Sequence, residues 1–447
     1  MPSPPEFSAA AVVLMDAQTG LVLYESEGHA ENYPASVTKI MTALLVLEHA
    51  TDLEERIEFC DEAIWSIPRN SSNIGMDVGE TLSVRDALYA LMLESANEVS
   101  VALAIHIAGS VEEFVDLMNR RALQIGAINT HFENPSGLPS NRHVTTAYDM
   151  ALIMREAVRN EMFTEIISTL RFDIAPTERQ SETRHLLNTN RQIQAGPHFN
   201  EYVIGGKTGW TSAAGNTLVT YAADENRRLI VSVLQGDGAG TFTDTNALLD
   251  YGFALPLETV TVFDASAYSV SVPVEQDING NPTEIGRTRL TAERDLQFEL
   301  PPDWSHSWLR YELSVPETLA PPILLGTTVG RVAVFVQDVF VGEVTLTAQD
   351  AVFAYTPPVY EEESSYVQNE IIIPQAANEH QFQIFSGSLS FLNNEYIITL
   401  AIPLALSLAT LFFAVMASLT RHKRRLRRIV RARRARFSRY PHYRYKN

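Results

Sequence analysis

The sequence has few of the residues that usually build covalent cross-links and metal centres. One cysteine, Cys60, occurs in 447 residues, which excludes an intrachain disulfide framework and a cysteine-based metal site. We expect Cys60 to end a short strand, 56–60, as a small buried hydrophobic residue. The 11 histidines form neither an HExxH motif nor a paired cluster. No metal and no cofactor is therefore predicted.

Lysine is the second scarce residue. The first 395 residues contain only Lys39 and Lys207 beside 19 arginines, and the other two lysines, Lys423 and Lys446, lie near the C-terminus. Arginine can replace lysine at most solvated positions, but it cannot act as a general base because its pKa stays above about 12. The two remaining lysines therefore mark places where amine chemistry is needed, with an accident of composition as the alternative.

Negative charge predominates, but it is unevenly distributed. Residues 421–447 carry 13 Lys or Arg and no Asp or Glu, so the 420 residues before them carry 21 basic side chains against 54 acidic ones. An acidic body repels phosphates, which argues against a nucleic-acid partner. The basic tail could bind RNA in principle, but its position directly after an apolar run favours contact with a membrane.

Long uncharged runs are rare, and the clearest is 396–420, with 25 residues. A helix of that length spans a hydrocarbon core of about 30 Å. The cations that follow fit the positive-inside rule, which favours a single membrane helix over a buried core helix. The tail would then lie in the cytoplasm against anionic lipid, with residues 1–395 outside the cell membrane. A tail-anchored protein with a cytoplasmic body would put the basic tail on the wrong side.

Export of residues 1–395 requires a signal peptide, and the N-terminal residues do not resemble one. They have no basic region, and their apolar run is short. We expect that a leader has been removed or that the recorded start is too late. The run 9–15 is better interpreted as a buried strand that turns into a second strand, 21–24.

The pattern along the chain divides it into five parts. Apolar residues at helical spacing predict helices at 36–47, 82–94 and 111–126, and adjacent strands are predicted at 218–222 and 229–234. Ser83 is the expected N-cap of the second helix. Short alternating runs after about residue 259 indicate a small all-β domain. The predicted parts are an α/β domain at 6–255, a β domain at 256–357, a linker at 358–395, a membrane helix at 396–420 and a basic tail at 421–447.

Three short motifs carry the residue types of serine-based acyl transfer. A serine hydroxyl is a weak nucleophile until a neighbouring base takes its proton, and a lysine three residues away on a helix lies on the same face. That lysine acts as a base only if burial or a nearby cation lowers its pKa. The motifs are Ser36-Val37-Thr38-Lys39, Ser95-Ala96-Asn97 and Lys207-Thr208-Gly209, the last followed by Trp210. Each motif is common, but the ordered set is more specific and resembles that of serine β-lactamases and penicillin-binding proteins.

The segments around these motifs resemble the low-molecular-mass penicillin-binding proteins, the serine-type D-alanyl-D-alanine carboxypeptidases. The resemblance runs from Phe7 to about Val352 and implies a penicillin-binding/β-lactamase-like α/β (α+β) domain. Its antiparallel sheet of about five strands would be flanked by helices and followed by the small β domain and the membrane helix. The segments include VVLMDAQTGLVLYE, PASVTKIMTALLVLE, GETLSVRDALYALMLESANEVSVALA, FENPSGLPSNRHVTTAYDMA, VIGGKTGWTSAAGNTLV and APPILLGTTVGRVAV.

The same resemblance implies a role for each site residue. Ser36 would attack the penultimate D-alanine of a peptidoglycan stem peptide, Lys39 would take its proton, and Ser95 would pass a proton to the leaving D-alanine. β-Lactams would acylate Ser36 in the same way. The residues expected to bind substrate are Asn97 at the amide, Lys207 and Thr208 at the terminal carboxylate, and, in the KTG segment, Gly209 and Trp210, with the N–H groups of Ser36 and Trp210 as the oxyanion hole.

Some features depart from the family pattern and leave alternatives. The middle motif is SANE instead of SGND, and the loop QGDGAGTF has Asp237 and no arginine for the substrate carboxylate. Carboxylate binding is therefore expected to rely on Lys207 and Thr208. Glu94 and His143 are expected to be a solvated helix end and a structural loop residue. A β-lactamase would need a deacylating base, for which no ExxxN-type motif is present, and a non-catalytic wall-binding protein is the other alternative.

Overall fold

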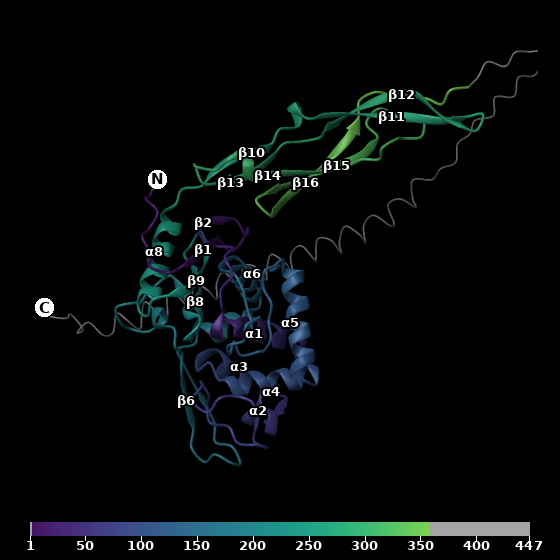
Figure 1. Cartoon of the computed structure of the whole chain (residues 1–447). Helices are drawn as coiled ribbons and strands as arrows, with labels where there is room; N and C mark the ends of the chain where they lie inside the picture. Colours follow the sequence, from purple (N-terminus) through teal and green to yellow (C-terminus); the bar gives the residue numbers. More distant parts are fainter. Residues whose placement is uncertain (1, 357–447) are drawn as a thin grey trace, which may run out of the picture.

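A five-stranded antiparallel sheet forms the centre of the first domain (Figure 1). The computed structural model describes residues 2–356. The strand order is β2-β1-β9-β8-β7, so β2 and β7 form the two edges of the sheet. The strands are β1 (Ala11–Asp16), β2 (Val22–Ser26), β7 (Val203–Thr211), β8 (Gly215–Ala223) and β9 (Arg228–Gly236). The predicted opening hairpin and the predicted neighbouring strands at 218–222 and 229–234 are confirmed.

Helices cover both faces of this sheet, which is why every residue of β1 is buried. Val13 on β1 packs in one apolar cluster with α1, α3, α4 and α6, whereas Val12 packs on the opposite face in a second cluster with Leu248 of α8. Because successive side chains of a strand point to opposite faces, a strand covered on both sides is apolar throughout rather than alternating. The helices are α1 (Lys39–His49), α3 (Val84–Leu93), α4 (Asn97–Ala108), α5 (Val111–Ile125), α6 (Ala147–Ala157), α7 (Glu161–Ser168) and α8 (Gly240–Ala254).

One of two predicted helix starts is confirmed, and the other is shifted. Ser83 caps α3 as predicted, its hydroxyl accepting a hydrogen bond of 3.0 Å from the N–H of Asp86. The helix predicted to begin at Ser36 begins instead at Lys39, because residues Ala35–Thr38 form a 3-10 turn, η1. Ala35 precedes the nucleophile candidate with a φ of 50°, a left-handed conformation that turns the chain sharply.

Smaller elements surround the helical part. Cys60 is only half-buried, at the N-cap of α2 (Asp61–Trp65), which corrects the expectation of a buried residue. The strand before it ends at Glu58, two residues short of the predicted end at 60. The two short hairpins pair β3 (Arg56–Glu58) with β4 (Thr81–Ser83) and β5 (Arg171–Ile174) with β6 (Arg184–Leu187).

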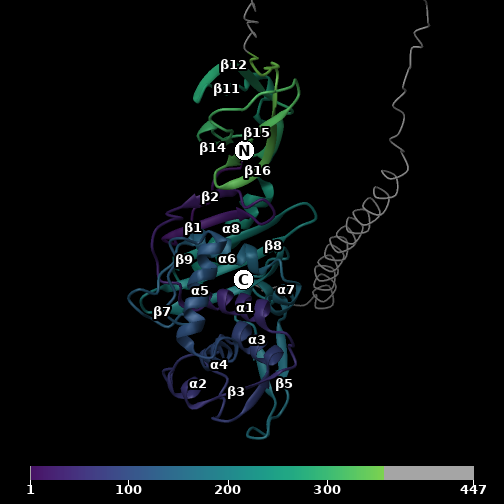
Figure 2. The same cartoon turned by 90° about the vertical axis from the view of Figure 1, so that its right-hand side faces the viewer.

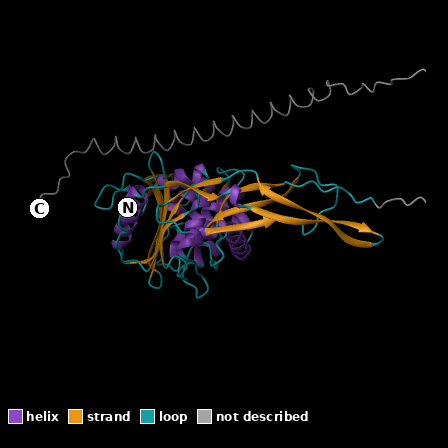
Figure 3. Cartoon of the chain, turned by 90° about the horizontal axis from the view of Figure 1, so that it is seen from above, coloured by secondary structure: helices purple, strands orange, loops and turns teal. Residues whose placement is uncertain are grey.

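The second domain is built from strands and lies beyond β1 and β2, at the end away from α2 and β5 (Figure 2). Seen from above, its strands extend the molecule lengthwise away from the helices (Figure 3). A five-stranded sheet of order β11-β12-β16-β15-β14 accompanies the pair β10-β13. Its strands are β10 (Glu258–Phe263), β11 (Ser269–Ile278), β12 (Asn281–Ala292), β13 (Leu296–Leu300), β14 (Leu309–Ser314), β15 (Thr328–Val336) and β16 (Val339–Ala348).

One side chain fastens the β domain to the edge of the first sheet. The Gln337 amide, in the turn between β15 and β16, accepts from the N–H of Val22 at 3.0 Å and donates to the carbonyl of Val22 at 3.3 Å. It thereby pairs with the backbone of β2 as a neighbouring strand would, and covers part of an exposed sheet edge. The domain boundary that we predict at 255/256 falls in the short connection between α8 and β10.

The remaining predicted parts lie outside the described residues. These are the linker at 358–395, the membrane helix at 396–420 and the basic tail at 421–447. Within residues 2–356, no helix combines the length and the apolar character needed to cross a bilayer.

Two glycines have the same left-handed backbone conformation, but replacing each with alanine should destabilise the protein to a different extent. Gly109, at the end of α4, has a φ of 87° and open space where a Cβ would lie, whereas Gly137 has a φ of 86° and its Cβ would overlap the carbonyl oxygen of Ala35. We expect Gly109→Ala to lower the free energy of unfolding by about 1 kcal/mol from backbone strain alone. Gly137→Ala should lower it by about 3 kcal/mol or more, because Ala35 must also move. Urea unfolding of both variants measures the difference, and equal losses would contradict the close packing at Gly137.

Candidate active site

Ser36 and Lys39 meet at the start of α1. The Lys39 side-chain nitrogen lies 3.1 Å from the Ser36 hydroxyl oxygen. In a 3-10 turn, side chains at i and i+3 stand directly above one another, so η1 aligns this pair more closely than a regular α-helix would. The shift of the helix start to Lys39 therefore preserves the predicted contact.

Lys39 is fully buried and has two further partners, both carbonyl oxygens. Its Nζ donates to the side-chain oxygen of Asn97 at 2.7 Å and to the backbone oxygen of Ser136 at 2.6 Å. A neutral amine has two N–H bonds and one lone pair, and carbonyl oxygens can only accept. When Lys39 is uncharged, the two carbonyls take its two hydrogens and the lone pair faces the Ser36 hydroxyl.

The environment of Lys39 favours this uncharged form. Burial is the main cause that lowers the pKa of Lys39 well below its usual value, and the positive charge of Lys207 lowers it further. Glu98, also buried, acts in the opposite direction on the pKa of Lys39. Burial in turn raises the pKa of Glu98, which weakens its carboxylate as a counter-charge.

The SxN segment lies at a sharp turn between α3 and α4. Ser95 has a φ of 62°, rare for a residue with a side chain. Its hydroxyl is buried and contacts no hydrogen-bond partner among the described residues. A strained residue whose buried polar atom has no protein partner is a frequent feature of active sites, where a ligand completes the contacts. Asn97, the first residue of α4, links this turn to Lys39.

The KTG segment runs along the edge strand β7. Lys207 is buried, and its Nζ donates to the carbonyl of Thr208 at 2.9 Å. Burial lowers the pKa of Lys207 to about 7, with Glu94 opposing the shift. A Cβ at Gly209 would lie 2.8 Å from the backbone nitrogen of Ser36. Glycine is therefore required for β7 to pass this close to the nucleophile turn.

These segments form the walls of one cleft with a volume of about 390 Å³. Five predicted residues line it, and Lys39, Asn97 and Lys207 lie behind that surface. The indole of Trp210 is 66% exposed, so it stands at the mouth of the cleft. The cleft is lined by Ser36, Ser72, Glu94, Ser95, Thr189, Arg191, Thr208, Gly209, Trp210, Asn216, Gly238, Ala239 and Phe242.

Several lining residues were not predicted from the sequence. Arg191 begins a 3-10 turn whose start is capped by Asn190, and its guanidinium lies 5.8 Å from the centre of the Phe242 ring. An asparagine-capped turn shortly before KTG was the available signal. Glu94, expected to be solvated, lines the cleft and accepts from the N–H of Leu187 at 2.6 Å. The sequence could not have predicted the role of the Ser136 carbonyl, because every residue has a backbone carbonyl and a motif records only side chains.

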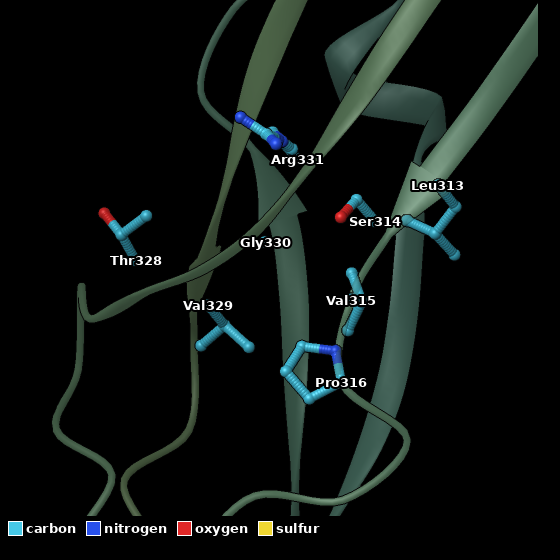
Figure 4. Close-up of a pocket in the computed structure, with 8 residues that line it drawn as sticks. All are labelled: Leu313, Ser314, Val315, Pro316, Thr328, Val329, Gly330 and Arg331. Carbon is cyan, nitrogen blue, oxygen red and sulfur yellow. The ribbon is translucent and has the colours of Figure 1, made fainter.

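A larger hollow, about 660 Å³, lies on the β domain, where β14 ends and β15 begins (Figure 4). Its side chains surround an open surface, with Arg331 as the charged member. It has hydroxyls at Ser314 and Thr328 but no lysine, histidine or carboxylate to activate them. Size therefore does not identify the reactive site, and the smaller cleft does. Within residues 2–356, no group of three or more His, Cys, Asp or Glu side chains could hold a metal ion.

Known proteins are similar to this chain in sequence. The family model described as peptidase S11, D-alanyl-D-alanine carboxypeptidase, matches residues 1–238. The chain is 32% identical over 329 residues to the carboxypeptidase DacF of Bacillus subtilis, covering 72% of this chain and 80% of that protein. It is 30% identical over 348 residues to the carboxypeptidase DacD of Escherichia coli, covering 75% and 85%.

Solved structures agree with these sequence matches. Penicillin-binding protein 5 from Haemophilus influenzae is 27% identical, with a TM-score of 0.56 over 79% of this chain and 100% of that chain. The carboxypeptidase DacD from Francisella tularensis, at 24% identity and a TM-score of 0.57, supports the fold alone. Since the family model matches more than half of the sequence, this chain belongs to the peptidase S11 family, the serine D-alanyl-D-alanine carboxypeptidases.

Proposed function

We propose that Ser36 and Lys39 carry the first step of the carboxypeptidase reaction on a peptidoglycan stem peptide. Lys39, uncharged, takes the hydroxyl proton as the Ser36 oxygen bonds to the carbonyl carbon of the penultimate D-alanine. The observation that supports this most strongly is the set of three contacts at Lys39 Nζ, two to carbonyl oxygens and one to Ser36. The N–H groups of Ser36 and Trp210 would stabilise the oxyanion that forms.

The second half of the reaction needs a proton on the leaving amine and then a water. The C–N bond to the terminal D-alanine breaks as Ser95 relays a proton from Lys39 to that nitrogen. A water then attacks the ester on Ser36 and gives a proton to Lys39, which passes it to the Ser36 oxygen as the C–O bond breaks and the shortened peptide leaves. The unpartnered hydroxyl of Ser95 supports its role, because it is free to bond to the substrate nitrogen. β-Lactams would acylate Ser36 by the same first step and leave slowly, since no separate deacylating base is identified.

The substrate would be held at its amide and at its terminal carboxylate. Asn97 uses its oxygen on Lys39, so its N–H₂ group remains for the substrate amide. Thr208, whose hydroxyl lies 2.7 Å from that of Thr189, and the cation of Lys207 would bind the carboxylate. Arg191 adds an exposed guanidinium in the same cleft, from a segment other than the arginine-free loop at Asp237. We therefore assign part of the carboxylate binding to Arg191.

A fluorescent penicillin tests the assignment of nucleophile and base. Wild type should be labelled covalently, with the label on the peptide that contains Ser36, and Ser36→Ala should not be labelled. Lys39→Arg keeps the positive charge but cannot release a proton at neutral pH, so acylation should fall by about 100-fold or more. Labelling of Lys39→Arg at the wild-type rate would rule out the general-base role, and absence of labelling in the wild type would favour a non-catalytic binding protein.

Arg191→Gln tests the carboxylate site. Loss of one charge-assisted hydrogen bond at an exposed position should lower kcat/KM for a peptide ending in D-Ala-D-Ala by about tenfold. The effect should shrink for a substrate whose terminal carboxylate is amidated. Arg159→Gln, which removes an exposed guanidinium paired with Glu156 on the surface, is the matched control and should not change kcat/KM. Equal effects of the two variants would remove Arg191 from the carboxylate site.

We also propose that residues 396–420 anchor the chain in the cell membrane, with the catalytic domain outside. The support is sequence alone, namely 25 residues without formal charge followed by 13 cations. Expressed in a bacterium behind an export signal, the full chain should stay with the membrane after alkaline extraction. A variant ending at Glu395 should be released. Release of the full chain by alkali would contradict the anchor.

A further inference from the structure

His143 is a buried titratable residue close to the reactive pair that the proposed reaction does not use. It is 1% exposed, belongs to the loop 131–144, and contacts the start of α1 through Thr38. Its Nδ1 accepts from the N–H of Glu133 at 3.0 Å, and its Nε2 lies 2.9 Å from the hydroxyl of Thr38. A peptide N–H can only donate, so Nδ1 carries no hydrogen, and the neutral ring donates from Nε2 to Thr38.

The loop that His143 holds is the one that brings a carbonyl to Lys39. Its two ends are tied by reciprocal hydrogen bonds between His131 and Val144, of 2.9 and 3.0 Å. Inside it, the side-chain oxygen of Asn134 accepts from the backbone N–H groups of Ser136, Gly137 and Leu138. Hydrogen bonds inside the loop therefore hold the turn around Ser136 in shape, and the bonds at its ends close it.

Three residues of the η1–α1 segment bind this loop. Thr38 bonds to His143, Lys39 donates to the carbonyl of Ser136, and the hydroxyl of Thr42 donates to the carbonyl of Pro135 at 2.7 Å. Among these contacts, the one to His143 lies beside the paired ends of the loop, next to Val144. If the His143 ring is removed, the loop loses its bond to Thr38 and its internal bond to the N–H of Glu133, so that the contacts from Thr42 and from Lys39 itself are left to hold the Ser136 carbonyl in place.

We propose that His143 is a positioning residue for Lys39, which fixes the loop so that the carbonyl of Ser136 occupies one N–H of the uncharged amine. The lone pair is then directed at the Ser36 hydroxyl. This inference rests on the proposed role of Lys39 as the base. It requires a neutral ring, because an imidazolium would place an N–H against the N–H of Glu133.

The surroundings of His143 keep the ring neutral. Burial lowers the pKa of His143 to about 4, the charges of His131 and Lys39 act in the same direction, and Glu133 opposes them. An unfolded histidine titrates near about pH 6.5. The unfolded chain therefore binds more protons between about pH 6.5 and pH 4, so the stability that this residue contributes is complete above that window and is lost as pH falls through it.

The test measures the rate constant of acylation by a labelled penicillin from about pH 5 to about pH 10, together with thermal unfolding. Acylation needs uncharged Lys39, so the rate falls at low pH as Lys39 becomes protonated, and this fall is the acid limb of the pH profile. The Ser136 carbonyl stabilises the ammonium form more than the amine, so losing its contact should lower the pKa of Lys39. In His143→Ala, we expect the plateau rate to fall about tenfold and the acid limb to move to lower pH. His143→Asn, whose side-chain oxygen can still accept from Glu133, should recover part of both effects.

Controls separate this role from simple support of the fold. His131→Ala removes an exposed ring on the same loop, bonded to the carbonyl of Arg142, and should leave rate and limb unchanged. Thr38→Val keeps the shape but removes the hydroxyl, and should reproduce the limb shift of His143→Ala. A lower fraction of active protein in His143→Ala with an unmoved acid limb would overturn the proposal. Normal acylation by Lys39→Arg would instead refute the base itself.

Discussion

The proposed chemistry depends on keeping one buried amine without its proton. An isolated charge is costly to bury, so a fully buried lysine is uncharged unless a counter-charge compensates it. At Lys39 the burial is complete, the nearby cation, Lys207, opposes protonation, and the buried Glu98 compensates only in part. Carbonyl oxygens, not carboxylates, take the N–H bonds. The site can therefore orient the amine without neutralising the effect of burial on its pKa.

The fold meets this requirement by bringing distant segments together around one cleft. The nucleophile turn, the SxN turn and the KTG strand are separated by roughly 60 and 110 residues, and each is fixed by a different device. A 3-10 turn stacks Ser36 on Lys39, a left-handed residue places Ser95 against the cleft, and a glycine lets β7 approach the backbone of Ser36. Each device strains or restricts the chain, and the apolar clusters on both sides of the sheet hold it in place.

Basic groups lie in and behind the cleft of a strongly acidic protein. Arg191 lines the cleft together with Glu94, and Lys207 lies behind its surface; Arg191 and Lys207 are the groups proposed to bind a substrate carboxylate. The loop QGDGAGTF lacks a basic residue, and the guanidinium reaches the cleft from the 3-10 turn at Arg191 instead. This placement supports the proposed binding of an anionic peptide end, and the acidic surface is the basis for predicting no nucleic-acid partner. The β domain, fastened to β2 through Gln337, forms the lengthwise extension of the catalytic body.

The sequence by itself determined the reaction class, the family and most elements of the sheet, and it singled out the residues proposed to react. Local spacing decides which side chains share a turn, and the scarcity of lysine isolated Lys39 and Lys207 from the background. Tertiary structure decided the helix start at Lys39, the half-exposure of Cys60, and the entry of Arg191 and Glu94 into the cleft. It also decided that Ser136 contributes a carbonyl and that His143 contacts the start of α1. A motif records side chains, whereas these contacts depend on backbone atoms and on surfaces that meet only after the chain has packed.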